Sequence, residues 1–299
     1  MEHGRRLRRV WLRVLVVIFI ADARQAEGRA DSAGTARDVE QLLALASVCE
    51  RDREIIAWMI ALTLREQALG ELRRLLCRDP SAVGSLAVVE KALADAHPAA
   101  THLEAVRGEC CQALAEAVRR GHIPVQSASG KMSWTDQFLY NHLEWMPTGD
   151  LADLARLMGR EVRIAALPYS EARDAWQQFR NDLTEPMPLS PICRVQLPFP
   201  ARSQDAAEEE EAQVSLARAA IAAARLRVER GVWPTDLGGL LPEGVIDPYT
   251  GEELRYAVKG DSARLWIVVP KESLVGTPRN PDIGVLLFPL GDQTPFEGK

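Results

Sequence analysis

The sequence predicts a mainly α-helical protein that ends in a small α+β tail. Three observations lead to this fold class. Apolar residues recur every three or four positions over residues 37–183, five prolines interrupt that pattern in residues 184–204, and short β-type runs follow Gly231. With 299 residues, 47% of them hydrophobic, the chain can bury a substantial core.

The helical domain is predicted over residues 37–183. Asp79-Pro80 ends its first helical stretch and His97-Pro98 ends its second, because proline disfavours helix in the residue before it. No convincing strand pattern occurs in this region. The short connections between helical stretches predict antiparallel neighbours in an N-terminal helical bundle.

A proline-rich connector is predicted over residues 184–204 and a helix followed by a small antiparallel sheet over residues 205–299. The acidic run Glu208–Glu211 is expected in the first turns of that helix, where the helix dipole favours negative charge. It is interpreted as a helix-start feature in preference to a ligand cage. One narrow, small-residue face is expected on the helix: Val214, Ala217, Ile221, Ala224 and Val228. The runs "ELRYAV", "ARLWIVV" and "IGVLLFPL" are the predicted strands.

The N-terminus resembles a secretory signal. Residues 1–23 combine a run of arginines, the apolar stretch Val14–Ile20 and the small residues Ala21 and Ala23, which fit a cleavage site. The apolar stretch is shorter than the roughly 20 residues that span a bilayer. A cleaved signal is therefore predicted, with an uncleaved anchor or a basic helix as alternatives, and residues 24–36 are expected to be a linker.

The chain contains five cysteines, and none of their spacings is a CxxC pair: Cys49, Cys77, Cys110, Cys111 and Cys193. In an oxidising compartment an odd number leaves at least one of them unpaired within the monomer. Free cysteine is often buried, so the helical cysteines are interpreted as small core residues. The pairing itself is left open by the sequence.

Residues 229–256, "ERGVWPTDLGGLLPEGVIDPYTGEELRY", hold the most unusual composition, yet each special residue has a folding role. A glycine stops the long helix, an aromatic residue and a proline turn the chain back, "TDLGGLL" forms a short helical turn, and "DPYTG" leads into a strand. The predicted structural-motif residues are Gly231, Trp233, Pro234, Asp247, Pro248, Tyr249, Gly251 and Tyr256.

This order of motifs resembles the C-terminal region of type II secretion major pseudopilins, over residues 205–299. It is similar also to the tails of uncharacterised exported proteins of planctomycete-type bacteria, which resemble this chain upstream at "REIIAWMIALTLREQALGELRRLL", at Arg107-Gly108-Glu109 and at Leu167–Ala172. The resemblance implies export and an α+β tail. It does not imply filament assembly or calcium binding, because a helical domain intervenes, no Gly-Phe prepilin junction exists, and the late loop offers only Glu272 and Asp282.

No catalytic, cofactor or metal site is predicted. The sequence has no GxSxG or HExxH motif, and His97 and His102 are expected to be loop and cap histidines because their spacing is poor for one helical face. The formal charge of the chain is −6, and five of its arginines lie within residues 1–23. The rest of the chain is therefore more negative still, which argues against capture of nucleic acid.

The leading hypothesis is an exported, periplasmic or envelope-associated structural or interaction protein with a protein partner in the cell envelope. In this hypothesis, membrane contact is limited to an uncleaved N-terminal segment. An envelope hydrolase with a carboxylate or histidine site unmarked by any motif, and a small-molecule binding module in the helical domain, are the alternatives.

Overall fold

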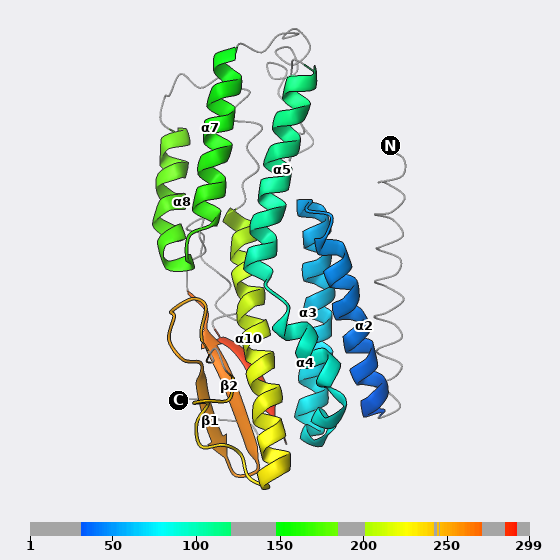
Figure 1. Ribbon diagram of the computed structural model, residues 1–299. Helices are drawn as coiled ribbons and strands as arrows, with labels where there is room; N and C mark the ends of the chain where they lie inside the picture. The colour runs from blue at the N-terminus through cyan, green and yellow to red at the C-terminus, as the bar shows by residue number, and fades with distance from the viewer. Residues whose placement is uncertain are drawn as a thin grey trace.

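The computed structural model describes residues 31–120, 148–184, 201–241, 244, 246–270 and 285–291, and it confirms the predicted fold class. Helices predominate, and a small antiparallel sheet follows them (Figure 1). The elements are α2 (Ser32–Glu50), α3 (Ile55–Arg78), η1 (Pro80–Ser85), α4 (Ala87–Ala94), α5 (Pro98–Arg120), α7 (Thr148–Ala165), α8 (Tyr169–Thr184), α10 (Ala201–Arg230), β1 (Arg255–Lys259), β2 (Ser262–Val268) and β3 (Val285–Leu290).

Helix α2 begins inside the expected linker. Its N-cap residue is Asp31, whose side chain accepts a hydrogen bond from the backbone N–H of Gly34 at 2.9 Å. Residues 32–36 are therefore helical, and Thr35 and Ala36 are already buried. The predicted signal, residues 1–23, and the first seven linker residues lie outside the described residues.

The first helical stretch of the sequence is two helices. The chain leaves helix geometry after Glu50, and Arg53 adopts a positive φ of 48° before α3 begins at Ile55. Helices α2 and α3 then pack side by side as a hairpin (Figure 1). No proline or glycine marks this break, which explains why the sequence pattern did not reveal it.

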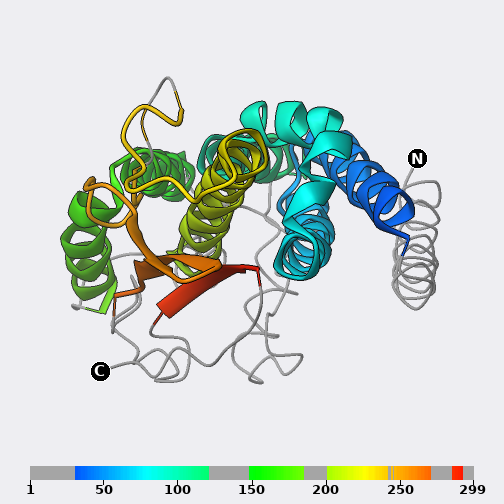
Figure 2. The same cartoon turned by 90° about the horizontal axis from the view of Figure 1, so that it is seen from below.

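Helix α10 lies in the middle of the molecule. It contacts α3, α4 and α5 on one side and strands β2 and β3 on the other, and Figure 2 shows it between the N-terminal helices and the sheet. Of its expected small-residue face, Val214, Ala217, Ile221 and Ala224 are buried, whereas Val228 is exposed. Additional buried alanines surround that face, so neighbours approach α10 from several directions.

The three strands form an antiparallel sheet in the order β1-β2-β3, which confirms the predicted strands. Gly260, with φ 59°, turns the chain between β1 and β2. Alternate residues Ala263, Leu265 and Ile267 of β2 are buried against the helices. The sheet therefore covers the helical body with one face.

The predicted helical domain, residues 37–183, and the predicted α+β tail, residues 205–299, share one hydrophobic core. One cluster of buried residues runs from Ala36 in α2 to Leu290 in β3. Helix α8 continues to Thr184 and α10 starts at Ala201, so both ends of the expected connector are helical, while residues 185–200 lie outside the described residues.

The interpretation of the cysteines as core residues is confirmed for Cys49, Cys77 and Cys110, which are buried and form no disulfide with another described cysteine. Cys111 is free and exposed, and Cys193 lies outside the described residues. Within the described parts of the chain, no helix has the length and apolar character needed to cross a membrane.

Gly108 in α5 permits a close approach to the turn between α2 and α3. A Cβ atom at this position would lie 2.1 Å from the carbonyl oxygen of Arg53. This contact is backbone and cannot move away as a side-chain end could. The "GE" segment of the upstream resemblance therefore contains a packing glycine.

We expect Gly108→Ala to destabilise the fold by about 1 to 3 kcal/mol, because an overpacked contact must separate α5 from the α2–α3 turn. Urea unfolding followed by circular dichroism measures the change. Gly70→Ala in α3 is the matched control, since nothing lies within 4 Å of its added Cβ. It should raise the unfolding free energy by up to about 1 kcal/mol through helix propensity. Equal effects of the two substitutions would contradict the close approach.

Candidate functional site

The predicted motif over residues 229–256 is a set of chain-turning devices. Gly231 has φ 75° and its N–H donates to the carbonyl of Arg227 at 2.9 Å, so it ends α10 as predicted. Trp233 is buried, and its Nε1–H donates to the carbonyl of Asp261 at 3.0 Å. The indole thus joins the end of α10 to the β1–β2 turn.

The "DPYTG" segment forms the predicted turn. Gly251 has φ 73°, and its N–H donates to the carbonyl of Asp247 at 2.8 Å. The carboxylate of Asp247 accepts a hydrogen bond from the N–H of Tyr249 at 2.8 Å, with Pro248 between them, and burial raises its pKa. The ring of Tyr249 packs edge-on against Tyr169 at 4.9 Å between centroids.

Tyr256 lies in β1 as predicted, opposite Leu265 of β2. Burial raises the pKa of its phenol to about 12, and the phenol oxygen has no hydrogen-bond partner among the residues described. The helical turn expected at "TDLGGLL" is a single hydrogen-bonded turn, in which the N–H of Leu240 donates to the carbonyl of Leu237 at 3.2 Å. The side chain of Asp236, one of the two expected caps, accepts from the N–H of Gly238 at 3.0 Å at the start of this turn.

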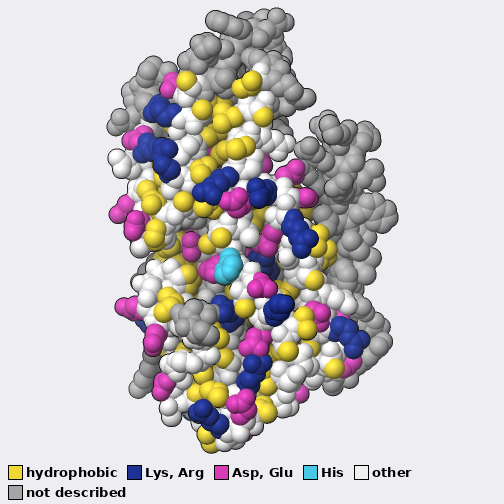
Figure 3. All heavy atoms as spheres, in the orientation of Figure 1, with side chains coloured by type: hydrophobic (Ala, Val, Ile, Leu, Met, Phe, Trp, Pro, Cys, Tyr) yellow, Lys and Arg dark blue, Asp and Glu magenta, His cyan; other side chains and the backbone are white. Residues whose placement is uncertain are grey.

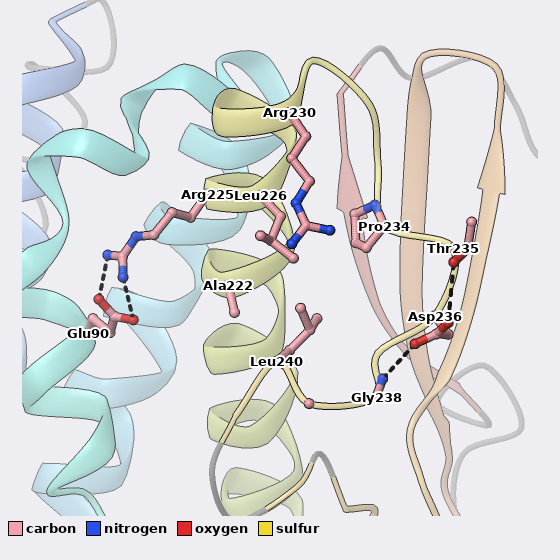
Figure 4. Close-up of a pocket in the computed structure, with 11 residues that line it drawn as sticks. Glu90, Ala222, Arg225, Leu226, Arg230, Pro234, Thr235, Asp236, Gly238 and Leu240 are labelled. Carbon is pink, nitrogen blue, oxygen red and sulfur yellow. Dashed lines mark hydrogen bonds and ion pairs between the residues drawn. The ribbon is translucent and has the colours of Figure 1, made fainter.

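These turns form one wall of a pocket of about 380 Å³ between α4, the C-terminal half of α10 and the loop 234–240 (Figure 4). Pro234 is the one predicted motif residue that lines it. The other lining residues are Glu90, Ala222, Arg225, Leu226, Arg230, Thr235, Asp236, Gly238, Gly239 and Leu240.

At one end of this pocket Arg225 binds Glu90 of α4 with both guanidinium nitrogens, at 3.1 and 2.5 Å. Such a two-point pair fixes the orientation of both side chains. At the other end Asp236 is engaged by Gly238 and by the hydroxyl of Thr235 at 3.2 Å. Figure 4 shows Arg230 extending from the end of α10 between these two ends.

A second polar centre is buried where α2, α3 and α10 meet. Arg65 of α3 donates to Glu50 of α2 at 2.6 Å and to Glu210 of α10 at 2.7 Å, and its side chain is 3% exposed. Thr101 of α5 donates to the same oxygen of Glu50 at 2.8 Å. Arg65 therefore joins three helices through charge-assisted hydrogen bonds. We call Glu50, Arg65, Thr101 and Glu210 the Arg65 junction.

The position of the acidic run Glu208–Glu211 contradicts its interpretation as a helix-start feature. Because the helix begins at Ala201, Glu208–Glu211 lie beyond its first turn, and the helix dipole at its start does not account for them. Glu208 and Glu210 are buried, and desolvation raises the pKa of each to about 7. Glu211 accepts a hydrogen bond from the N–H of Ala99 at 3.3 Å. The run therefore packs against the helical body.

The expectation of a loop or cap role for His102 is also wrong. His102 lies inside α5, is 1% exposed, and its Nε2 is joined to the hydroxyl of Ser203 at 2.8 Å. Its ring is 4.8 Å from that of Trp58. Burial lowers its pKa to about 4, so the ring is neutral at pH 7. His97, in contrast, is exposed just before α5.

Glu161 of α7 is a buried acid that sequence analysis did not single out. It is 0% exposed, and neither carboxyl oxygen has a hydrogen-bond partner within the described residues. Burial raises its pKa to about 9. Burial, followed by the charge of Glu161, also raises the pKa of the Cys110 thiol to about 12, so this thiol is not a nucleophile at neutral pH.

A second pocket, of about 280 Å³, opens between α2 and α4 and reaches Glu50 and Arg65 of the junction. Solvent therefore approaches one end of the ion pair. Within the described residues, no group of three or more histidine, cysteine, aspartate or glutamate side chains is arranged to hold a metal ion.

Comparisons with known proteins return no match. No protein-family model, no curated protein and no solved structure is significantly similar to this chain.

We expect Arg65→Met to lower the unfolding free energy by about 3 to 5 kcal/mol at pH 8, since it leaves the buried carboxylate of Glu210 and the partly buried one of Glu50 without their cation. The loss should be smaller at pH 5.5, where a protonated Glu210 no longer carries a buried charge. Denaturant unfolding at the two pH values measures it. Arg107→Met is the control, because its pair with Glu104 is half exposed and contributes at most about 1 kcal/mol. A loss that does not change with pH would refute the electrostatic role of Arg65.

Glu208 should make stability depend on pH. Its pKa is about 7 in the folded protein and about 4.5 when exposed, so the folded state binds more protons between these values. The unfolding free energy should therefore fall as pH rises from 5 to 7, by at most about 1.4 kcal/mol per pH unit from this group. Melting temperatures of Glu208→Gln across this range should fall less steeply than those of the natural protein. Glu229→Gln, at an exposed position, should keep the natural slope.

Proposed function

We propose that this chain is an exported or envelope-associated structural or interaction protein, in which the helical body and the α+β tail act as one rigid unit. The observation that carries the proposal is the Arg65 junction. Its charged residues belong to three helices, and each has its hydrogen-bonding partner on another helix. Both carboxylates of this junction are engaged in holding helices together.

Contacts along the first turns of α10 support the same reading. Trp176 of α8 donates to Gln204 at 2.7 Å, and Tyr169 donates to Asp205 at 3.0 Å. His102 of α5 is joined to Ser203 there as well. Three consecutive residues of α10 are thus bonded to two other helices, which favours a fixed arrangement over a moving one.

The surface supports a protein partner more than a polyanion. Figure 3 shows acidic and basic side chains interspersed with hydrophobic ones over the described part of the face in view. A nucleic-acid site would require a concentration of basic side chains, whereas protein interfaces tolerate this mixture. The formal charge of −6 agrees with that preference.

The hydrolase alternative receives less support from the described residues. Glu161 has the raised pKa expected of a general acid, but it is fully buried and lines neither described pocket. Glu50 does line a pocket, and its carboxylate is already held by Arg65 and Thr101.

Expression of the full chain in a diderm bacterium tests the proposal. We expect mass spectrometry to find a mature N-terminus just after Ala23 and fractionation to recover the protein with the periplasm or envelope. A chain without residues 1–23 is the matched control and should stay in the cytoplasm. Recovery of the full chain from the cytoplasm with Met1 intact would overturn the proposal.

A further inference from the structure

The charged side chains around the pocket of Figure 4 differ in the partners they have. Four charged side chains line it, and three of them are engaged: Arg225 and Glu90 bind each other, and Asp236 accepts from Gly238 and Thr235. The fourth, Arg230, has no ion pair or hydrogen bond among the described residues. The Arg230 guanidinium therefore keeps free donors beside a hollow of about 380 Å³ whose lining is neutral as a whole.

Arg227, one turn earlier on α10, shows how a structural arginine is held at this helix end. It pairs with Asp261, and its guanidinium lies over the Trp233 ring at 5.9 Å from the centroid. Arg230 is not held in this way. Figure 4 shows its side chain extending along the pocket beside Pro234. A guanidinium in this position has donors free for a planar anion.

Four apolar side chains line the pocket between its charged residues, and the larger part of its exposed lining is polar. Ala222 and Leu226 of α10 face Pro234 and Leu240 of the loop across the hollow. Gly239, with φ 73° and open space where a Cβ would be, leaves the loop backbone accessible. The volume of the pocket falls within the usual range of small-ligand sites.

We propose that this pocket binds a small organic monocarboxylate, with Arg230 holding the carboxylate and the Ala222–Leu226 and Pro234–Leu240 walls contacting its short apolar body. The carboxylate forms a two-point contact with the guanidinium, as Glu90 does with Arg225. The fixed Arg225–Glu90 pair closes the α4 end of the pocket.

The charge of the walls favours a monoanion over a dianion such as phosphate. Two carboxylates, Glu90 and Asp236, and two guanidiniums, Arg225 and Arg230, line the pocket, so the lining is neutral without a ligand. A monoanion leaves one uncompensated negative charge, whereas a dianion leaves two. A metal cation is disfavoured for a similar reason, because both carboxylates are already engaged.

Chemical labelling of the purified chain tests this inference without reference to its location in the cell. Phenylglyoxal modifies accessible guanidinium groups, and mass spectrometry of peptides gives a rate for each arginine. The probes are N-acetylalanine and its neutral analogue N-acetylalaninamide, which differ only in the carboxylate. Arg51, exposed at the end of α2, is the internal control in the same molecule.

We expect N-acetylalanine to slow modification of Arg230 at least twofold at probe concentrations on the order of its millimolar Kd, which is typical of so small a ligand. The amide should have no effect, and the Arg51 rate should not change. Equal protection by both probes, protection of Arg51 as well, or no protection would overturn the proposal. Stronger protection by inorganic phosphate than by N-acetylalanine would overturn the assignment to a monocarboxylate.

Variants provide a second measurement. Saturation-transfer NMR should detect N-acetylalanine binding to the natural protein and to Arg51→Gln, and at least tenfold weaker binding to Arg230→Gln. Because Arg230 is exposed and makes no ion pair or hydrogen bond within the described residues, Arg230→Gln should melt at the temperature of the natural protein. Undiminished binding by folded Arg230→Gln would refute its role. Because this test uses purified protein, its failure would leave the proposed envelope role intact.

Discussion

A buried guanidinium needs carboxylates as partners, and in this fold that need brings α2, α3 and α10 together around Arg65. Arg65 lies inside the helical body, where a lone charge would be costly. One of its partners, Glu50, comes from the end of α2, and the other, Glu210, comes from a helix that begins more than 130 residues later. The tail helix must therefore enter the body, and the sheet that follows α10 is carried with it.

The alanine-rich composition of α10 makes this entry possible. Buried alanines such as Ala217, Ala220 and Ala224 keep the helix thin, so α3 and α5 approach it on one side and the sheet on the other. Longer polar residues reach other elements from three parts of the helix: Gln204 at its start, Glu210 in its first half, and Arg225 and Arg227 near its end. The body and tail thus share one core.

Local chemistry made much of the fold predictable. Proline and glycine mark boundaries because they restrict the backbone or release it, and Asp79-Pro80, Gly231 and Gly251 all act as their sequence context indicated. The break at Arg51–Glu54 was missed because it contains neither residue, and the helical period continues across it. The acidic run was misplaced because α10 begins at Ala201, four residues before the start predicted for the tail at residue 205.

The sequence by itself determined the fold class, the strands and the turns of the 229–256 motif, since these depend on periodicity and on the conformational limits of neighbouring residues. Only the tertiary structure decided that Arg65 joins three helices, that His102 is buried, and that Arg230 faces a pocket without a partner among the described residues. These features join residues far apart in the chain. A single sequence specifies their charges but not their neighbours, and burial and pairing together set what those charges can do.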